Sequence, residues 1–214
     1  MKPFNYPKRI LAAALAALCL AGASAMTPAE AFVSAPRQIF PLLDRNARLD
    51  MIDYFNSGMS TRTANALNGT SAVTAMTPST ITVETTGAST VELVVLPCGN
   101  DTVVAVISTV RTPAPDSKIA VCSSDWKKTL TPQFFSKPEL KDWLTDDGRR
   151  NRGEVESFVP FLLISYAYDP SASTLTLTNN TREFLSDDVY AIVEPFLKQT
   201  IVYRWNGKRF TVTK

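Results

Sequence analysis

The 214-residue chain contains no histidine. This absence excludes Ser-His-Asp triads, Cys-His dyads and metal sites built on imidazole. The chain also has no glycine-rich phosphate loop, no CxxC pair and no EF-hand loop. With 45% apolar and 20% charged residues, its composition is that of a globular protein and argues against wholesale disorder. The sequence therefore predicts no catalytic, cofactor-binding or metal-binding residue and no cofactor.

Long apolar runs are scarce, and the clearest one lies near the N-terminus. Three basic residues among the first nine precede the run Ile10–Gly22, and Ala23-Ser24-Ala25 follows it. This succession is typical of a cleaved secretory signal peptide, and the run is shorter than the ~20 residues that a spanning helix needs. We expect residues 1–25 to be removed on export, leaving a protein of the periplasm or outer cell surface without a membrane span. An uncleaved membrane anchor is the alternative.

Basic and acidic residues are nearly balanced in number. Loss of residues 1–25 leaves 19 Lys and Arg against 20 Asp and Glu, a net charge of −1. A nearly neutral chain has no bulk attraction to nucleic acid or acidic membranes, so no nucleic-acid partner is expected.

Cysteine is also rare, since only Cys98 and Cys122 lie outside the predicted signal peptide. An export compartment permits a disulfide. If the strands are ordered sequentially, one strand separates the two residues, which places them about 9.6 Å apart when a disulfide wants Cα atoms within ~7 Å. The bond requires a different strand order or a loop that folds over, and the sequence leaves this open.

Helical and strand patterns alternate along the remaining chain. Residues 26–37 lack periodicity and predict a flexible N-terminal arm. Residues 41–58 predict a helix with Asp44 as N-cap and Gly58 as its stop. From residue 70 to 122 the apolar period is two, which predicts a β-meander whose 103–110 strand is central because it is apolar on both faces.

Residues 136–156 predict a short helix followed by a loop. Ser136 and Glu139 form the pattern of a capping box, which predicts a short helix running to residue 144. Residues 145–156 are charged and contain two glycines, so they predict a mobile loop between two lobes.

The C-terminal part predicts strands over 158–168 and 174–178 and a helix from Ser186 that Pro195 ends or kinks. Asn206-Gly207 predicts a two-residue hairpin turn. That turn pairs three residue couples across residues 201–212, namely Trp205 with Lys208, Tyr203 with Phe210 and Ile201 with Val212.

Together these patterns predict an α+β fold of mainly antiparallel sheets, a β-meander plus C-terminal hairpins, packed with a few short helices. We expect a single domain over 38–214, with one sheet-bearing lobe over 38–144 and a second over 157–214. The second lobe alone is too short to be a secure independent domain.

Several groups of side chains have residue types and spacings that suit catalysis or metal binding. Ser124 and Lys127 match the S-x-x-K spacing of serine hydrolases, but a strand-end turn with an exposed lysine is the simpler interpretation. Asp50 and Asp53 share one side of the first helix and suit a metal or acid–base pair, yet a solvated helix face explains them too. Asp187-Asp188 fit the favourable end of a helix dipole.

Two further groups are ambiguous in the same way. The basic residues Arg149, Arg150 and Arg152 are flanked by acids, which favours a solvated loop over a nucleic-acid patch. Five aromatic residues either line a ligand groove or, as is commoner in strands, form core: Tyr166, Tyr168, Tyr203, Trp205 and Phe210.

Scattered motifs along the chain resemble a secreted Bacteroidetes family catalogued as domain of unknown function 3256. Arg48-Leu-Asp-Met-Ile-Asp53 is the most specific stretch, and the others are Pro41-Leu-Leu43, Tyr54-Phe55, the Leu-Pro ending at Pro97, Asp116-Ser117, Trp126 and Tyr203–Phe210. The resemblance implies export from a Gram-negative cell and carries over no catalytic residue. It also makes Asp101-Thr102-Val103 similar to the O-glycosylation signal of these bacteria, although an ordinary hairpin turn explains it equally.

The sequence favours a non-enzymatic binding or interaction module of the bacterial envelope, with an envelope or extracellular protein or a small ligand as its partner. Two alternatives remain open: a hydrolase using carboxylates or Ser124 and Lys127, and a structural component of an envelope assembly.

Export predicts a defined N-terminus. Because the cleavage motif ends at Ala25, intact-mass measurement of the protein from its native cells should give a chain that begins at Met26. A chain that retains Met1 would contradict both the cleavage and the expected location.

Overall fold

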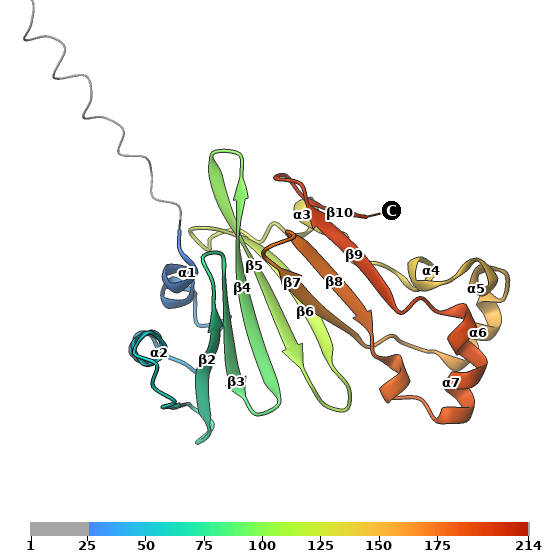
Figure 1. Cartoon of the computed structure of the whole chain (residues 1–214), viewed down its shortest axis with the longest axis horizontal. Coiled ribbons are helices and arrows are strands. Elements are labelled where there is room, and N and C mark those ends of the chain that lie inside the picture. The colour runs from blue at the N-terminus through green and yellow to red at the C-terminus, as the bar shows by residue number, and fades with distance from the viewer. Residues whose placement is uncertain (1–25, 214) are drawn as a thin grey trace, which may run out of the picture.

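The computed structural model describes residues 26–213, so the predicted signal peptide over 1–25 lies outside the described residues. Two antiparallel sheets form its body, with helices at both ends (Figure 1). This is the predicted α+β class with two sheet-bearing lobes. Within the described residues, no helix is long and apolar enough to cross a membrane.

The first sheet has six strands in sequential order, which confirms the β-meander. Its strands are β1 (Thr63–Ala64), β2 (Thr70–Met76), β3 (Thr80–Thr86), β4 (Ser89–Cys98), β5 (Asp101–Val110) and β6 (Asp116–Ser123). The second sheet has the order β10-β9-β8-β7. Its strands are β7 (Ile164–Asp169), β8 (Thr174–Asn179), β9 (Thr200–Trp205) and β10 (Phe210–Val212).

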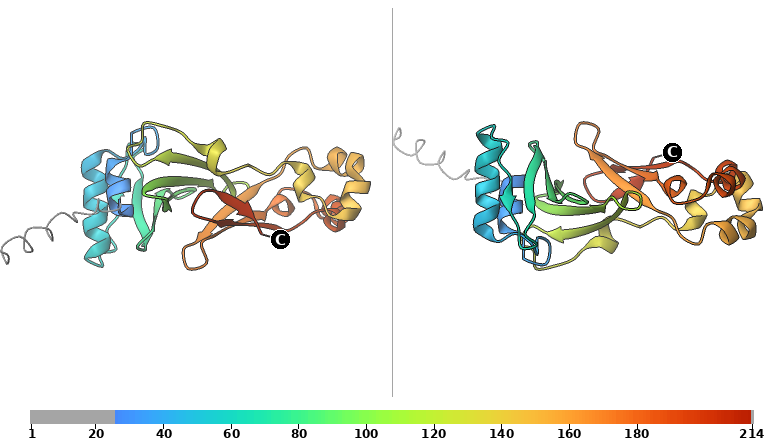
Figure 2. Two further views of the ribbon diagram at one scale, coloured as in Figure 1. Left: turned by 90° about the horizontal axis from the view of Figure 1, so that it is seen from above. Right: turned by 90° about the horizontal axis from the view of Figure 1, so that it is seen from below.

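Helices are short, and apart from α3, which lies beside β9 and β10, they lie at the two ends of the molecule (Figure 1 and Figure 2). At one end are α1 (Pro28–Ser34) and α2 (Arg45–Asn56). After β6 come α3 (Thr131–Phe134), α4 (Leu140–Trp143), α5 (Asp146–Arg150), α6 (Arg152–Phe158), α7 (Asp187–Val193) and the 3₁₀ turns η1 (Thr181–Glu183) and η2 (Glu194–Phe196). The α7 helix ends just before Pro195, as predicted.

The six-stranded sheet is buried on both faces at its centre. On β4, Leu93 and Val95 pack with α1 and α2, whereas the alternate residues Val94 and Leu96 pack with the second sheet. This explains why residues 103–107 of β5 are apolar without alternation and are all buried. The sheet therefore carries two separate apolar layers, one against helices and one against strands.

The two sheets also meet along a polar seam between β6 and β7. Asp116 Oδ1 accepts a hydrogen bond from the backbone N–H of Ile164 (3.0 Å), and Ser117 Oγ accepts one from that of Tyr166 (3.1 Å). Side chains of β6 thus satisfy backbone donors on the edge of β7 that a neighbouring strand would otherwise satisfy. This protects the edge of the second sheet and fixes its position on the first.

Glu92 lies on the β4 face that looks toward the second sheet, paired with Ile107 of β5. Burial raises its pKa to about 7, and the backbone N–H of Tyr168, which donates to the carboxylate, offsets only part of this rise. A carboxyl group in this position is accommodated best when it is protonated.

The prediction of a flexible arm over 26–37 is wrong. Thr27 caps α1, because its hydroxyl accepts from the N–H of Glu30 (3.2 Å) while the Glu30 carboxylate accepts from the N–H of Thr27 (2.8 Å). Phe32 on this helix is fully buried. The segment is too short to show a helical period in its sequence, although Thr-x-x-Glu with proline at the first helical position is a recognisable start signal.

The prediction of a mobile loop over 145–156 is also wrong, since the segment forms α5 and most of α6. Thr145 caps α5, and its N–H donates to the carbonyl of Phe196 (2.9 Å). Val155 is buried in a third apolar cluster with residues of α7. The predicted strand over 158–168 accordingly begins only at Ile164.

Two finer predictions need correction. The short helix after Ser136 is capped by Glu139 together with Asp142 rather than by Ser136. In the C-terminal hairpin, Trp205 pairs with Phe210 and Tyr203 with Val212, so four residues form the turn instead of two. The Asn206 side chain explains this, because its Oδ1 accepts from the N–H groups of Lys208 (3.0 Å) and Arg209 (2.8 Å).

A shift of two residues leaves the strand side chains of the hairpin on their predicted faces, although Val212 at its end is exposed. Tyr203, Trp205 and Phe210 are buried, whereas Arg204 and Thr211 are exposed. The open disulfide question is also answered, because Cys98 and Cys122 are free thiols in β4 and β6 with β5 between them.

Substitution by alanine should have opposite effects on stability at the two glycines of α5 and α6. A methyl group on Gly148 would collide with the backbone carbonyl of Phe196, whereas one on Gly153 meets nothing within 4 Å. We expect Gly148→Ala to destabilise the fold by about 1–3 kcal/mol through overpacking, and Gly153→Ala to stabilise it by ~0.5 kcal/mol through lower helix entropy cost. Urea denaturation measures both; equal effects would contradict the packing of α5 on η2.

The buried carboxyl group predicts a pH dependence of stability. Because the folded pKa of Glu92 is about 7 against an ordinary 4.5, the native state holds a proton that the unfolded state releases. Stability should therefore fall as pH rises from 4.5 to about 7.

Glu92→Gln should remove this loss of stability. The difference in unfolding free energy between the variant and wild type should therefore be about 1–3 kcal/mol more favourable to the variant at pH 8 than at pH 4.5. Urea melts at both pH values measure the gain. Glu154→Gln, a change on the exposed surface of α6, is the matched control. A gain that does not depend on pH would show that Glu92 is ionised in the folded protein.

Candidate functional site

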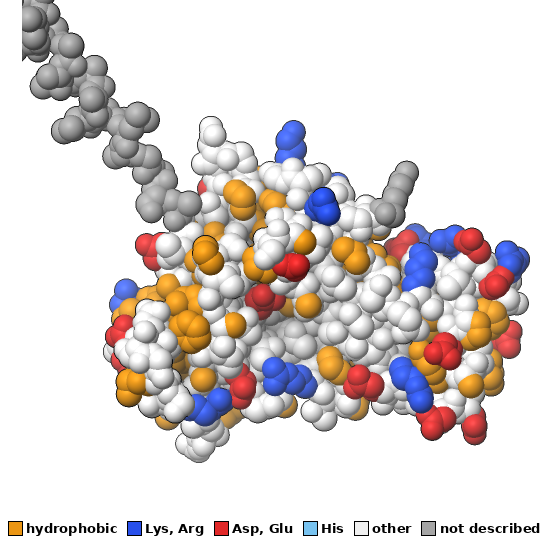
Figure 3. Space-filling model, in the orientation of Figure 1, with side chains coloured by type: hydrophobic (Ala, Val, Ile, Leu, Met, Phe, Trp, Pro, Cys, Tyr) orange, Lys and Arg blue, Asp and Glu red, His pale blue; other side chains and the backbone are white. Residues whose placement is uncertain are grey.

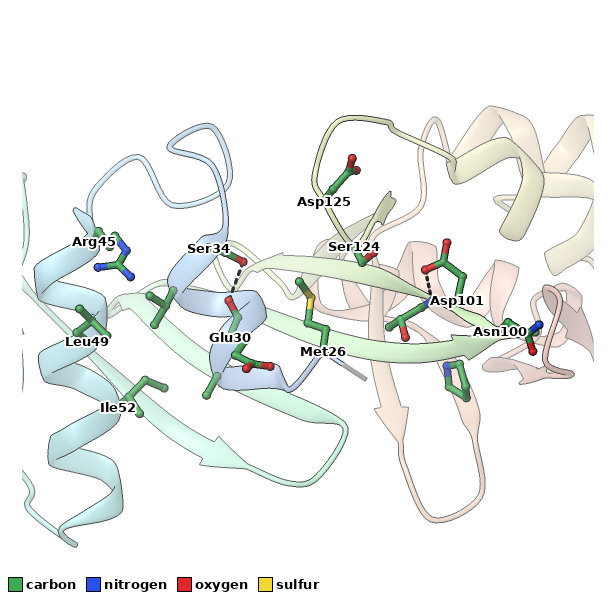
Figure 4. Close-up of a pocket in the computed structure, with 15 residues that line it drawn as sticks. Met26, Glu30, Ser34, Arg45, Leu49, Ile52, Asn100, Asp101, Ser124 and Asp125 are labelled. Carbon is green, nitrogen blue, oxygen red and sulfur yellow. Dashed lines mark hydrogen bonds between the residues drawn. The ribbon is translucent and has the colours of Figure 1, made fainter. Parts of the chain in front are cut away.

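An open groove of about 970 Å³ lies between the helices α1 and α2 and the tip of the β4–β5 hairpin (Figure 4). Four segments form it: α1 with the residues before it, α2, the hairpin tip, and the turn after β6. Its lining residues are Met26, Ala29, Glu30, Val33, Ser34, Arg45, Leu49, Ile52, Pro97, Gly99, Asn100, Asp101, Thr102, Ser124 and Asp125. Figure 3 shows hydrophobic side chains gathered on the surface at this end of the molecule.

A buried arginine holds the two helices of the groove together. The Arg48 guanidinium on α2 donates to the carbonyls of Phe32 (2.8 Å) and Ala35 (2.6 Å) at the C-terminus of α1. It also lies about 6 Å from the ring centres of Phe32 and Phe40. A cation at this helix end satisfies carbonyls that have no intrahelical partner, while burial lowers the pKa of Arg48.

The turn after β6 closes one side of the groove. Trp126 adopts a positive φ of 63°, and its Nε1 donates to the hydroxyl of Ser34 at the end of α1 (3.1 Å). The same turn is held by Asp125, whose carboxylate accepts from the Ser123 hydroxyl (2.7 Å) and the Lys127 N–H (3.1 Å). The turn and the helix are therefore fixed to each other.

The hairpin tip closes another side. Cys98 pairs with Asp101, so Gly99 and Asn100 form a two-residue turn in which Gly99 has φ +63°. Asp101 accepts from the N–H of Thr102 (2.7 Å). Asp101-Thr102-Val103 therefore begins strand β5 directly after the turn instead of forming the turn itself, and modification of the half-buried Thr102 stays a prediction.

The groove combines an apolar wall with negative charge. Its wall is formed by Ala29, Val33, Leu49 and Ile52, and Figure 4 shows Leu49 and Ile52 on the α2 side that faces α1. Its ionisable lining residues are three carboxylates and one cation: Glu30, Asp101, Asp125 and Arg45. Hydrogen bonds lower the pKa of Glu30, chiefly those from Thr27, and that of Asp125 to about 2, chiefly that from Ser123. These two groups are charged at neutral pH.

The sequence-derived catalytic candidates do not assemble into a site. Ser124 and Lys127 lie in a turn rather than on a helix, and the Lys127 ammonium pairs with Asp125 at 3.2 Å. Asp50 and Asp53 are exposed on α2, as the solvated-face interpretation predicts. Residues 26–213 contain no cluster of three or more potential metal ligands.

The remaining candidates are structural. Asp187 and Asp188 occupy the first turn of α7, where the helix dipole favours them. The three arginines each pair with a nearby carboxylate, Arg149 with Asp146 (2.7 Å), Arg152 with Glu156 (2.7 Å) and Arg150 with Asp147.

The five aromatic residues belong to the core between the sheets or pack against it, so the core interpretation is confirmed. Phe134 of α3 stacks on Trp205, and Phe135 at the C-cap of α3 packs with its ring tilted against Tyr203. Glu92, whose carboxyl pKa is the most raised of the acidic residues, is not among the residues that line the groove.

Sequence reasoning missed the groove itself. Its residues come from four segments that no local pattern joins, and two of its walls depend on α1, which was predicted to be a flexible arm. The capping pattern at Thr27 and Glu30 was the available signal. The groove needs that helix because Met26, Ala29 and Val33 all come from its turns or its entry.

Comparison with known proteins gives a family and a fold. The chain is 21% identical to a domain of an uncharacterized protein from Porphyromonas gingivalis W83, and the TM-score is 0.73. The match covers 86% of this chain and 96% of that domain, which shows a shared fold. No curated protein matches the chain. A family model described as "Protein of unknown function (DUF3256)" matches residues 20–210, and the chain is therefore a member of the DUF3256 family.

Proposed function

We propose that this protein is an exported, non-enzymatic binding module of the bacterial envelope and that the groove between α1, α2 and the β4–β5 tip holds its ligand. The ligand chemistry that fits is an extended apolar peptide segment of another envelope or extracellular protein, carrying lysine or arginine. The succession of basic, apolar and small residues before Met26 supports export.

One observation carries the binding role: apolar side chains line an accessible concave surface instead of core. Leu49 is 37% exposed, and Val33 and Ile52 are half-buried. Burying such surface in a complex contributes about 25 cal/mol per Å² of apolar area. Because Arg48 and Trp126 fix the walls to each other, the groove is preformed, which lowers the entropy cost of binding.

The charges select the type of segment. Asp101 and Asp125 approach the groove from the strand side and Glu30 from α1, while Arg45 is the only basic residue among residues 26–213 that lines it. Asp125 is already paired with Lys127 (3.2 Å), so within the described residues Glu30 and Asp101 supply the negative charge that has no ion-pair partner. Basic side chains of a ligand would therefore meet complementary charge, and acidic ones would be repelled.

The alternative functions receive less support from the same geometry. A Ser124–Lys127 hydrolase requires a free lysine amine beside the serine, whereas Lys127 pairs with a carboxylate. A structural component of an envelope assembly would use the same groove. It would differ from a binding module in holding one partner permanently instead of exchanging it.

Binding of a synthetic peptide of alternating leucine and lysine, compared with one of leucine and glutamate, tests the proposal by fluorescence anisotropy. The leucine–lysine peptide should bind, and the leucine–glutamate peptide should bind at least tenfold more weakly because of the carboxylates. Leu49→Ser should weaken binding about fivefold or more through lost apolar contact, and Asp101→Asn about threefold.

Matched variants lie outside the groove. Ile192→Ser changes an apolar residue of similar exposure (42%) on α7, and Asp50→Asn changes an exposed carboxylate of α2. Both should bind the peptide as wild type does. Equal binding of the two peptides, or equal weakening by Leu49→Ser and Ile192→Ser, would overturn the assignment of the groove.

A further inference from the structure

A second hollow, of about 450 Å³, lies where the C-terminal hairpin faces the segment before α4 and the helix α5. Its lining includes Lys137, Asp142, Arg149, Lys198, Tyr203 and Arg209. These residues come from four places in the chain that the fold brings together. None of them lines the acidic groove.

Four cations line this hollow, against one carboxylate, Asp142. Arg149 pairs with Asp146 at 2.7 Å. Within residues 26–213, Lys137, Lys198 and Arg209 have no carboxylate partner within ion-pair distance. After Asp142 and Asp146 are counted, the hollow keeps a net charge of +2, in a described chain that is almost neutral overall.

Two of the lining charges are held in place by the backbone. The Lys198 ammonium donates to the backbone carbonyl of Asp142 (2.8 Å), which anchors it at the hollow and leaves two of its protons free. The Asp142 carboxylate accepts from the N–H of Glu139 (2.8 Å) at the start of α4. Asp142 therefore serves the helix cap rather than neutralising the lysine.

The rest of the lining is rigid and mixed in character. Ile201, Tyr203 and Phe210 are buried members of the core between the sheets. The Tyr203 hydroxyl donates to the carbonyl of Ser136 (3.2 Å), which holds strand β9 and the segment before α4 together across the hollow. Hydroxyl groups of Ser136 and Thr211 add further hydrogen-bonding capacity.

We propose that this hollow is a binding site for a small organic oxyanion, such as a phosphorylated, sulfated or carboxylated sugar. Arg209 and Lys198 bind the oxyanion, because guanidinium and ammonium groups form strong charge-assisted hydrogen bonds with such oxygens. The apolar floor and the hydroxyl groups contact the remainder of the molecule. The site is independent of the peptide groove and opposite to it in charge.

Isothermal titration of the protein, residues 26–214, with glucose 6-phosphate, inorganic phosphate and glucose tests the proposal at low salt. Glucose 6-phosphate should bind, inorganic phosphate more weakly, and glucose not measurably. Arg209→Gln should weaken binding about tenfold, since one charge-assisted contact is lost, and Arg209→Lys should restore part of it.

Arg204→Gln is the matched control, because Arg204 is an exposed arginine of β9 that does not line the hollow. It should bind within about twofold of wild type, since its charge lies outside the site. Equal weakening by Arg204→Gln and Arg209→Gln would show diffuse surface charge and overturn the proposal, as would failure of every anion to bind. Vesicles of phosphatidylglycerol that bind with the same Arg209 dependence while glucose 6-phosphate does not would overturn the small-molecule assignment in favour of a lipid headgroup.

Discussion

The structure depends on the burial of the six-stranded sheet on both faces. Leu93 and Val95 serve the helix layer, and Val94 and Leu96 serve the layer shared with the second sheet. Because successive residues of a strand point to opposite faces, one stretch of β4 holds the helical end and the second sheet at once. The groove takes walls from the helix layer, and the hollow at the C-terminal hairpin takes walls from the second sheet.

Polar contacts then decide how the layers are oriented, since apolar burial has no direction of its own. Arg48 fixes α1 against α2 through two carbonyls of the helix end, and Asp116 and Ser117 fix β7 beside β6. Trp205 adds a third connection, because its Nε1 donates to the carbonyl of Pro97 beside the groove (3.0 Å). The groove is thus joined to the second sheet by direct contact.

The two hollows divide the charge of a nearly neutral chain. Carboxylates gather at the groove near α1, and cations gather at the C-terminal hairpin, over different elements. The net charge of the chain does not reveal this separation, because it describes only the long-range attraction of the whole molecule. The separation gives one small protein two hollows whose lining residues differ in the sign of their charge.

Local patterns in the sequence determined much of the fold. Asp44, Ser186 and Pro195 placed helix ends, the period of two placed β3, β4 and β8, and an apolar run on both faces placed β5, because these signals act through neighbours in the chain. The lack of histidine excluded imidazole chemistry without any structure.

Only the tertiary structure decided the rest. The α1 helix and the 145–156 segment gain their order from distant partners, Arg48 for one and Phe196 for the other. The register of the last hairpin followed from the Asn206 side chain, which bonds two backbone groups of the turn. Both proposed sites unite residues from separate segments, and no single-sequence pattern records which segments meet, because that choice is made by packing across the two faces of one sheet.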